Sequence, residues 1–93
     1  MARVEIYTTM LCPFCWRAKK LLEERGATFR EVDVMTDGSL RAEMRQRAGG
    51  RTSVPQIFIN GQHVGGCDDL YALDRAGKLA PLLQQSAWGQ PAT

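Results

Sequence analysis

The chain has 93 residues, 44% of them hydrophobic, and a formal net charge of +2 at pH 7. This length allows one compact domain with a modest core. The charge is too small, and its Arg and Lys residues too evenly mixed with Asp and Glu, to predict a nucleic-acid partner. No secretory signal or membrane span is expected. Three cysteines are too few for a disulfide scaffold, which favours a reducing, cytoplasmic location.

The first half of the chain predicts two strands and two helices in alternation. Residues 4–8 and 28–34 are the strands, and a helical crossover between them makes the strands parallel. The first helix ends at Gly26, and its apolar side consists of Phe14, Ala18, Leu21 and Leu22. The second helix begins at residues 37–39 and ends at Gly49-Gly50, with an apolar side of Leu40, Met44 and Ala48.

The second half opens with a hairpin signal. Residues 56–59 read as a short buried strand, and Asn60-Gly61 follows directly, which is typical of a two-residue hairpin turn. Residues 62–65 should therefore pair antiparallel with the strand before them. The order of elements up to this point places four strands in one mixed sheet.

A third helix completes the predicted fold. It begins around residues 67–69, turns Leu70 and Leu73 inward and ends at Gly77, and residues 79–85 add a short turn or helix. The order βαβαββα predicts an α/β fold in which helices flank a four-stranded mixed sheet. We expect one domain over residues 1–85 and a loose tail over residues 86–93.

Cys12-Pro13-Phe14-Cys15 lies where the first strand gives way to the first helix. Two thiols separated by two residues can close a small disulfide ring and open it again. Unpaired N–H groups and the positive end of the helix dipole favour the thiolate there. Pro13 needs no hydrogen-bond partner in a first turn and stiffens the ring. We assign Cys12, the more N-terminal thiol, as the nucleophile.

Two other interpretations of this pair have less support. A structural zinc site needs four ligands, and beyond the pair the chain offers only Cys67 and His63, so no metal is predicted. Buried, unreactive cysteines are disfavoured, because a helix that starts after a strand usually begins at the edge of a fold.

Four segments together resemble one family. They are Cys12-Pro13-Phe14-Cys15, the run Thr52 to Ile59, Asn60-Gly61, and the run Gly65 to Leu70. In this order and spacing, the chain from about Val4 to Leu83 resembles a glutaredoxin, specifically a small bacterial dithiol glutaredoxin of the thioredoxin fold.

The resemblance implies a groove for glutathione, the co-substrate. In that family the bond before the proline matching Pro55 is cis, which would turn the backbone of Val54 outward beside Cys12. The N–H and C=O of Val54 could then hydrogen-bond the cysteinyl part of glutathione like an added strand. The alternative is that Ser53-Val54-Pro55 is only a turn before a strand.

The second half of the implied groove is the start of the third helix. Gly66, Cys67 and Asp68 would hold the γ-glutamyl end of glutathione, with Asp68 or Asp69 paired to its amino group. The alternative is that the aspartates cap the helix, and both can hold together. The implied glutathione-binding residues are Cys12, Phe14, Ser53, Val54, Pro55, Gly66, Cys67, Asp68 and Asp69.

Two positions depart from many relatives, which carry a lysine three residues before the nucleophile and a tyrosine after the proline. Thr9 removes a cation that would help hold the thiolate and the glycyl carboxylate of glutathione. Phe14 keeps an aromatic wall but lacks the hydroxyl. A compensating charge could come from Arg17, Lys19, Arg47 or Arg51.

Three further residues have predictions of their own. Cys67 is assigned a backbone role, with a regulatory thiol as the alternative. His63 is predicted to be a solvent-facing strand residue. Trp16 is predicted to pack along the helix or to shield the site.

The resemblance implies a thiol–disulfide oxidoreductase with two routes. Cys12 alone would reduce glutathione mixed disulfides, and Cys15 would resolve the intermediate formed with protein disulfides. The expected partners are glutathione, glutathionylated or disulfide-containing proteins and, indirectly, the glutathione reductase system. A monomer is expected, without a bound nucleotide, a membrane or a nucleic acid.

Two alternative functions stay open at this stage. In an iron–sulfur carrier, two chains would share a cluster through Cys12 and two glutathione molecules, although a rigid Pro13 should hinder that geometry. A reductant fed by thioredoxin reductase is the other alternative, and the Gly66-Cys67-Asp68 segment favours glutathione instead.

Overall fold

The computed structural model describes residues 2–84, so the predicted tail lies outside the described residues. The elements in chain order are β1 (Val4–Thr8), α1 (Pro13–Glu24), β2 (Arg30–Asp33), α2 (Gly38–Arg47), β3 (Gln56–Ile59), β4 (Gln62–Gly65), α3 (Cys67–Arg75) and α4 (Leu79–Leu83). Within residues 2–84, no helix combines the length and the apolar character that a membrane span requires.

The four strands form one sheet in the order β2-β1-β3-β4. β1 runs parallel to β2 and antiparallel to β3. Asn60 and Gly61 turn β3 into β4 with φ values of 53° and 82°, the left-handed backbone that such a hairpin turn requires. The predicted mixed sheet and hairpin are confirmed.

The second strand is shorter than predicted. It begins at Arg30 rather than at residue 28, because its pairing with β1 starts with Glu5 opposite Arg30. Residues 28 and 29 come before the first paired position and are not part of the strand.

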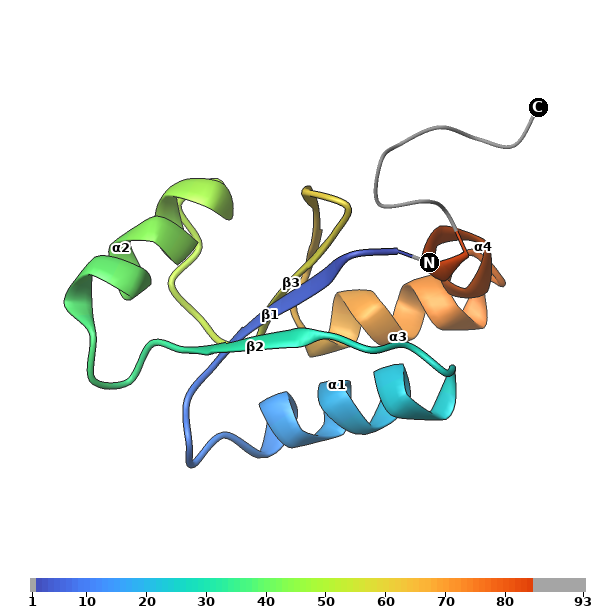
Figure 1. Ribbon diagram of the computed structural model, residues 1–93, viewed down its shortest axis with the longest axis horizontal. Helices are drawn as coiled ribbons and strands as arrows, with labels where there is room; N and C mark the ends of the chain where they lie inside the picture. Colours follow the sequence, from blue (N-terminus) through green and yellow to red (C-terminus); the bar gives the residue numbers. More distant parts are fainter. Residues whose placement is uncertain (1, 85–93) are drawn as a thin grey trace.

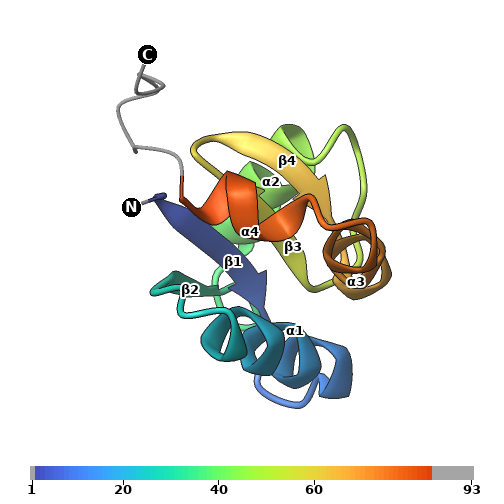
Figure 2. The same cartoon turned by 90° about the vertical axis from the view of Figure 1, so that its right-hand side faces the viewer.

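Helices cover both faces of the sheet (Figures 1 and 2). Val4 and Ile6 of β1 pack in one cluster with residues of α1 and α3. Tyr7 points to the opposite face and packs with Met44 of α2. This alternation follows from the two-residue period of a strand. All four residues of β3 are buried, as expected for a strand covered on both sides.

The buried stripe of α1 differs from the predicted one. Ala18, Leu21 and Leu22 are buried as expected, but Cys15 takes the place assigned to Phe14, whose side chain is 51% exposed. Residues 15, 18 and 22 share one helical stripe because they are three and seven positions apart. Phe14 lies beside that stripe and is left at the surface.

A cluster of polar side chains joins α2 to the sheet through hydrogen bonds. Arg47 donates to Glu5 Oε1 at 3.0 Å and to the Tyr7 hydroxyl at 2.6 Å, and its guanidinium lies 4.2 Å from the centroid of the Phe58 ring. Tyr7 in turn donates to Glu43 Oε2 at 2.6 Å. The hydrogen bond from Arg47 lowers the pKa of Glu5, so this pair is ionised at neutral pH.

Candidate active site

Cys12 caps the N-terminus of α1. Its backbone is extended, with φ −106° and ψ 108°, and Pro13 follows in the first turn of the helix. The Cys12 Sγ accepts a hydrogen bond from the Cys15 N–H at 3.2 Å. This contact takes up one of the N–H groups that every helix start leaves unpaired. The sulfur thus lies at the positive end of the helix dipole, where a negative charge is stabilised.

A second contact ties Cys12 to the loop before β3. The Cys12 thiol donates to the Val54 carbonyl at a sulfur–oxygen distance of 3.7 Å. The Val54–Pro55 peptide bond is cis, as the resemblance implied. A thiolate would lose this donation but keep the bond from the Cys15 N–H. Ionisation therefore leaves the Val54 carbonyl free to accept from a ligand.

Cys15 is the more protected thiol of the pair. Cys15 is 2% exposed, whereas Cys12 is only half-buried. Burial, followed by the hydrogen bond with Cys12, raises the pKa of Cys15 to about 12. The expectation that neither cysteine would be buried is wrong for Cys15, because it faces the core at the third position of the helix. Cys12 is the thiol that an incoming disulfide can reach.

The different settings of the two thiols predict selective alkylation. With iodoacetamide between about pH 6 and pH 9, Cys12 should label first while Cys15 stays unlabelled, because Cys12 is only half-buried whereas Cys15 is buried and thiols react far more slowly than thiolates. The raised pKa of Cys15 means that it stays as the less reactive thiol over this whole range. Mass-spectrometric peptide mapping over time measures both rates. In urea the three cysteines should label alike; equal labelling of Cys12 and Cys15 in the folded protein would contradict the assignment.

A hollow lies beside Cys12, between the loop before β3 and the start of α3. The residues that line it are Phe14, Arg51, Ser53, Val54, Pro55, Gly66, Cys67, Asp68 and Asp69. Apart from Cys12, every residue implied as glutathione-binding is among them, and Cys12 touches the hollow through Val54. We call this hollow the groove. Segments about forty residues apart in sequence are brought together here because β1 and β3 are neighbours in the sheet.

The two aspartates at the start of α3 have different roles. Asp69 Oδ2 accepts from the Gly66 N–H at 2.9 Å and from Arg51 at 3.1 Å. The Gly66 N–H, more than Arg51, lowers the pKa of Asp69. Asp69 is therefore a capping residue, as in the alternative interpretation. Asp68 is exposed at the edge of the groove, and its carboxylate has no protein partner among the described residues.

Gly65 makes the close approach of Asp69 feasible. Its φ is 122°, and a Cβ at this position would overlap the Asp69 carboxylate. The turn from β4 into α3 therefore requires glycine at this position, because a side chain would strain the backbone at this φ and would have no room.

One of the four candidate cations lines the groove. Lys19 is paired with Glu31 at 3.0 Å, and Arg47 belongs to the cluster with Glu5 described above. Arg17 lies over the Tyr71 ring. Arg51 alone of these four reaches the groove, where it contacts Asp69. Of the cations expected to compensate for Thr9, Arg51 is thus the one that lines the groove.

Sequence reasoning missed a polar chain behind the groove. Gln56 is fully buried, and its amide donates to the Ser53 carbonyl at 2.9 Å. Its Oε1 lies 2.6 Å from His63 Nε2, and the His63 ring lies 5.0 Å from the Phe58 ring. The prediction of a solvent-facing His63 is wrong, because this residue is half-buried. Burial lowers the pKa of His63. Gln56 is the one polar residue in the run Gln56–Ile59, and a polar residue in a strand expected to be buried could have indicated these hydrogen bonds.

Cys67 and Trp16 have contrasting surroundings. Cys67 is 6% exposed and belongs to the core cluster with α1, and burial raises its pKa. This setting favours the predicted backbone role over a reactive thiol. Trp16 is 62% exposed, with the Lys20 ammonium 5.4 Å from its ring. It lies along the helix, as predicted.

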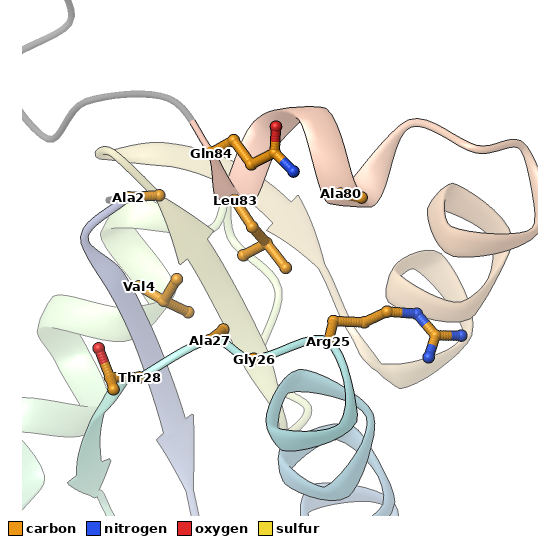
Figure 3. Close-up of a pocket in the computed structure, with 9 residues that line it drawn as sticks. All are labelled: Ala2, Val4, Arg25, Gly26, Ala27, Thr28, Ala80, Leu83 and Gln84. Atoms are coloured by element: carbon orange, nitrogen blue, oxygen red, sulfur yellow. The ribbon is translucent and has the colours of Figure 1, made fainter.

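A second hollow lies at the other end of β1 (Figure 3). It is bordered by Ala2, Val4, residues 25–28, two residues of α4 and Gln84 directly after that helix. Its single cationic side chain, Arg25, is bonded to Asp74 at 2.7 Å. None of the residues that line this hollow is a cysteine.

Comparison with known proteins links this site to one family. The glutaredoxin family model matches residues 4–64. The chain is 57% identical over 84 residues to glutaredoxin 3 of Escherichia coli K12, covering 90% of this chain and 100% of that protein.

Two solved structures are also similar. The solution structure of a Brucella melitensis glutaredoxin is 56% identical, with a TM-score of 0.80 and 90% of each chain covered. The crystal structure of a buckwheat glutaredoxin–glutathione complex is 32% identical, with a TM-score of 0.79, and covers 86% of this chain and 74% of the buckwheat chain. The mixed sheet with flanking helices is thus the thioredoxin fold that these proteins share.

Proposed function

We propose that this chain, which belongs to the glutaredoxin family, uses glutathione as the electron donor for its disulfide chemistry. Thiol–disulfide exchange on a cysteine pair is the activity of the family. Beyond that activity, we propose that glutathione is the donor, and we propose the roles of the groove residues and the order of the steps. The observation that carries the proposal is the groove, which places a strand-like backbone and a helix N-terminus beside the accessible thiol.

The groove offers matching groups for the parts of glutathione. The Val54 N–H and C=O suit the cysteinyl backbone, because an extended peptide can pair with them as a strand would. The N-terminus of α3 at Cys67 and Asp68 suits the γ-glutamyl carboxylate, and the exposed Asp68 carboxylate suits its amino group. Arg51 supplies a cation at the edge of the groove, and Phe14 provides an aromatic wall. The glutathione bound by the buckwheat relative supports this assignment.

The first route needs only Cys12. Its thiolate attacks the glutathionyl sulfur of a mixed disulfide, so that a Cys12–glutathione bond forms and the substrate leaves as a thiolate that takes a proton from water. A second glutathione thiolate then attacks the glutathionyl sulfur held on Cys12. Glutathione disulfide is released, and Cys12 returns to its thiolate form. The net reaction converts one mixed disulfide and one glutathione into one free thiol and one glutathione disulfide.

The second route reduces protein disulfides and needs both cysteines. Cys12 attacks one sulfur of the substrate disulfide and forms a mixed disulfide with the protein. Cys15 then attacks the Cys12 sulfur, which releases the reduced protein and leaves a Cys12–Cys15 disulfide. Two glutathione molecules reduce that disulfide in two exchange steps.

The setting in the cell follows from this chemistry. We propose a monomeric, cytoplasmic protein whose partners are glutathionylated or disulfide-containing proteins. The glutathione disulfide it produces would be reduced by glutathione reductase with NADPH, so the chain itself needs no nucleotide or metal.

A coupled assay tests the proposal directly. The native protein is mixed with glutathione, glutathione reductase, NADPH and a small glutathione mixed disulfide, and NADPH consumption is followed. Turnover that saturates with the mixed disulfide and requires glutathione supports the proposal. Turnover that instead requires thioredoxin reductase, or a visible charge-transfer band in protein purified without air, would favour one of the alternatives.

A further inference from the structure

Gln56 is a polar side chain in a strand that is otherwise apolar and fully buried. It is 0% exposed, and the other three residues of β3 are hydrophobic and buried. Burying an amide is costly unless its polar atoms have hydrogen-bond partners. A polar residue where the strand pattern calls for an apolar one is expected at positions that serve a function. The partners of this amide therefore indicate what Gln56 contributes.

Every polar atom of the Gln56 side chain has a partner. Its Nε2 donates to the Ser53 carbonyl at 2.9 Å and lies 3.3 Å from the Ser53 hydroxyl. Its Oε1 lies 2.6 Å from His63 Nε2. An amide oxygen only accepts hydrogen bonds, so the His63 Nε2 carries the hydrogen and donates it. The hydrogen bonds thus run in one direction, from His63 through Gln56 to Ser53.

Two of these three residues are fixed in the sheet, and the third is in a loop. Gln56 lies opposite Tyr7 in the pairing of β3 with β1, and His63 lies opposite Phe58 in the pairing of β4 with β3. The His63 ring also lies 5.0 Å from the Phe58 ring. Ser53 belongs to the loop before β3 and to no helix or strand. The hydrogen bonds of Gln56 therefore tie this loop to the sheet.

Holding the Ser53 carbonyl also sets the direction of the Val54 N–H. The Ser53–Val54 peptide bond is trans, whereas the next one is cis. In a trans peptide the C=O and N–H groups share one plane and point in opposite directions. Since the carbonyl points to Gln56, the Val54 N–H points away from it, to the side where Ser53 and Val54 line the groove. Among residues 2–84, this N–H donates to no backbone carbonyl.

We propose that Gln56 is a positioning residue for glutathione, and that His63 holds its amide in place. By holding the Ser53 carbonyl, Gln56 keeps the Val54 N–H aimed at the position of the cysteinyl backbone of glutathione. The inference rests on the proposed function and adds two residues that do not line the groove. It concerns recognition of the glutathione backbone. The reactivity of the Cys12 thiolate depends instead on the Cys15 N–H, which Gln56 does not touch.

The test compares two disulfides in their reaction with Cys12. In the Cys15→Ser protein, mass spectrometry follows adduct formation with glutathione disulfide and with bis(2-hydroxyethyl) disulfide, which has no peptide backbone. The ratio of the two second-order rate constants, divided by the same ratio for free N-acetylcysteine, is the glutathione preference. A change in the pKa or exposure of Cys12, or a loss of folded protein, alters both rates together and leaves this preference unchanged.

Gln56→Met, made in the Cys15→Ser protein, removes the donor and keeps a side chain of similar length. The glutathione preference should fall about tenfold, the effect of one ligand hydrogen bond that is no longer held in place. Gln62→Met, the same change at an exposed residue of β4, should keep the full preference. Circular dichroism reports folding, and if Gln56→Met does not fold, Gln56→Asn, whose amide is too short to reach Ser53, replaces it with a loss of the same direction.

His63→Phe tests the first link of the chain. It keeps a ring against Phe58 but cannot donate to Gln56, whose amide is then free to turn. The preference should fall about threefold, less than in Gln56→Met, because Gln56 can still reach Ser53 part of the time. The double variant Gln56→Met/His63→Phe should be no worse than Gln56→Met alone, since His63 acts through Gln56.

Each outcome bears on a separate claim. A preference that is unchanged in a folded Gln56 variant, or that falls as much in Gln62→Met, would overturn the positioning role and leave the proposed function standing. An unchanged preference in His63→Phe, or losses that multiply in the double variant, would contradict the part assigned to His63. A preference of one in the parent Cys15→Ser protein would overturn the proposed function, and the role of Gln56 with it.

Discussion

Replacing Cys12 by serine should abolish reduction of both glutathione mixed disulfides and protein disulfides. The serine hydroxyl is not ionised at neutral pH and cannot form a disulfide, so no intermediate can be held at the start of α1. Serine also preserves the hydrogen bond from the Cys15 N–H, because hydroxyls are good N-cap acceptors. The loss should therefore reflect chemistry rather than folding, and we expect it to exceed about a thousandfold in kcat/KM.

Cys67→Ser is the matched control for this change. It removes a thiol of the same size from the groove, but the proposed contribution of Cys67 comes from its backbone. Its side chain packs in the core cluster with α1, so a modest loss of stability is expected while most activity remains. If Cys12→Ser retained the native rate, or if Cys67→Ser lost activity to the same degree, the nucleophile would be wrongly assigned.

Cys15→Ser should separate the two routes. Activity on a small glutathione mixed disulfide should remain within a few-fold of the native value, since that route never uses Cys15. Reduction of an intramolecular protein disulfide should fall by more than about a hundredfold, because the mixed disulfide at Cys12 has no internal thiol to resolve it. Parallel assays on the two substrate types measure the difference.

The proposed resolving step requires Cys15 to react despite its burial. Burial is the largest cause that raises the pKa of Cys15 to about 12, and the hydrogen bond with Cys12 and the charge of its sulfur raise it further. Once Cys12 is part of a disulfide, its thiolate charge is gone, and the pKa of Cys15 should fall from that value. We therefore expect Cys15 to be a better nucleophile after the first step than before it. Loss of both activities in a folded Cys15→Ser protein would contradict this division.

Local patterns made much of the fold predictable. The hairpin at Asn60-Gly61 was predictable because two residues with left-handed backbone fix the turn and its register. The parallel pairing of β1 and β2 followed from the helical crossover between them. The shorter start of β2 could not be read from its own residues, because it depends on where β1 begins to pair with it.

The site was predictable in outline and less so in its side chains. Whether Asp69 caps α3 or contacts a ligand depends on a rotamer and on Arg51, which comes from a different part of the chain. The link from His63 through Gln56 to Ser53 likewise joins two strands and a loop. Such contacts arise only from the three-dimensional arrangement of the chain.

The exposed apolar residues next to Cys12 in the sequence show the same limit. Apolar residues in a sequence are usually assigned to the core, and Phe14 was assigned there on its helical spacing. Only the structure shows that Leu11 is 81% exposed and that Trp16 is 62% exposed beside the reactive thiol. The hydrophobic pattern alone does not separate a buried stripe from apolar residues that stay exposed.

The central claim is that glutathione is held on Cys12 with its backbone in the groove, and nuclear magnetic resonance tests it most directly. Isotope-labelled Cys15→Ser is treated with glutathione disulfide, and peptide mapping locates the adduct. The account predicts one glutathione on Cys12, with the largest amide shift changes at Val54, Cys67 and Asp68 and little change at Val4 or Gln84 in the far hollow. An adduct that forms on Cys67 instead, or an adduct on Cys12 that leaves the groove amides unmoved, would contradict it.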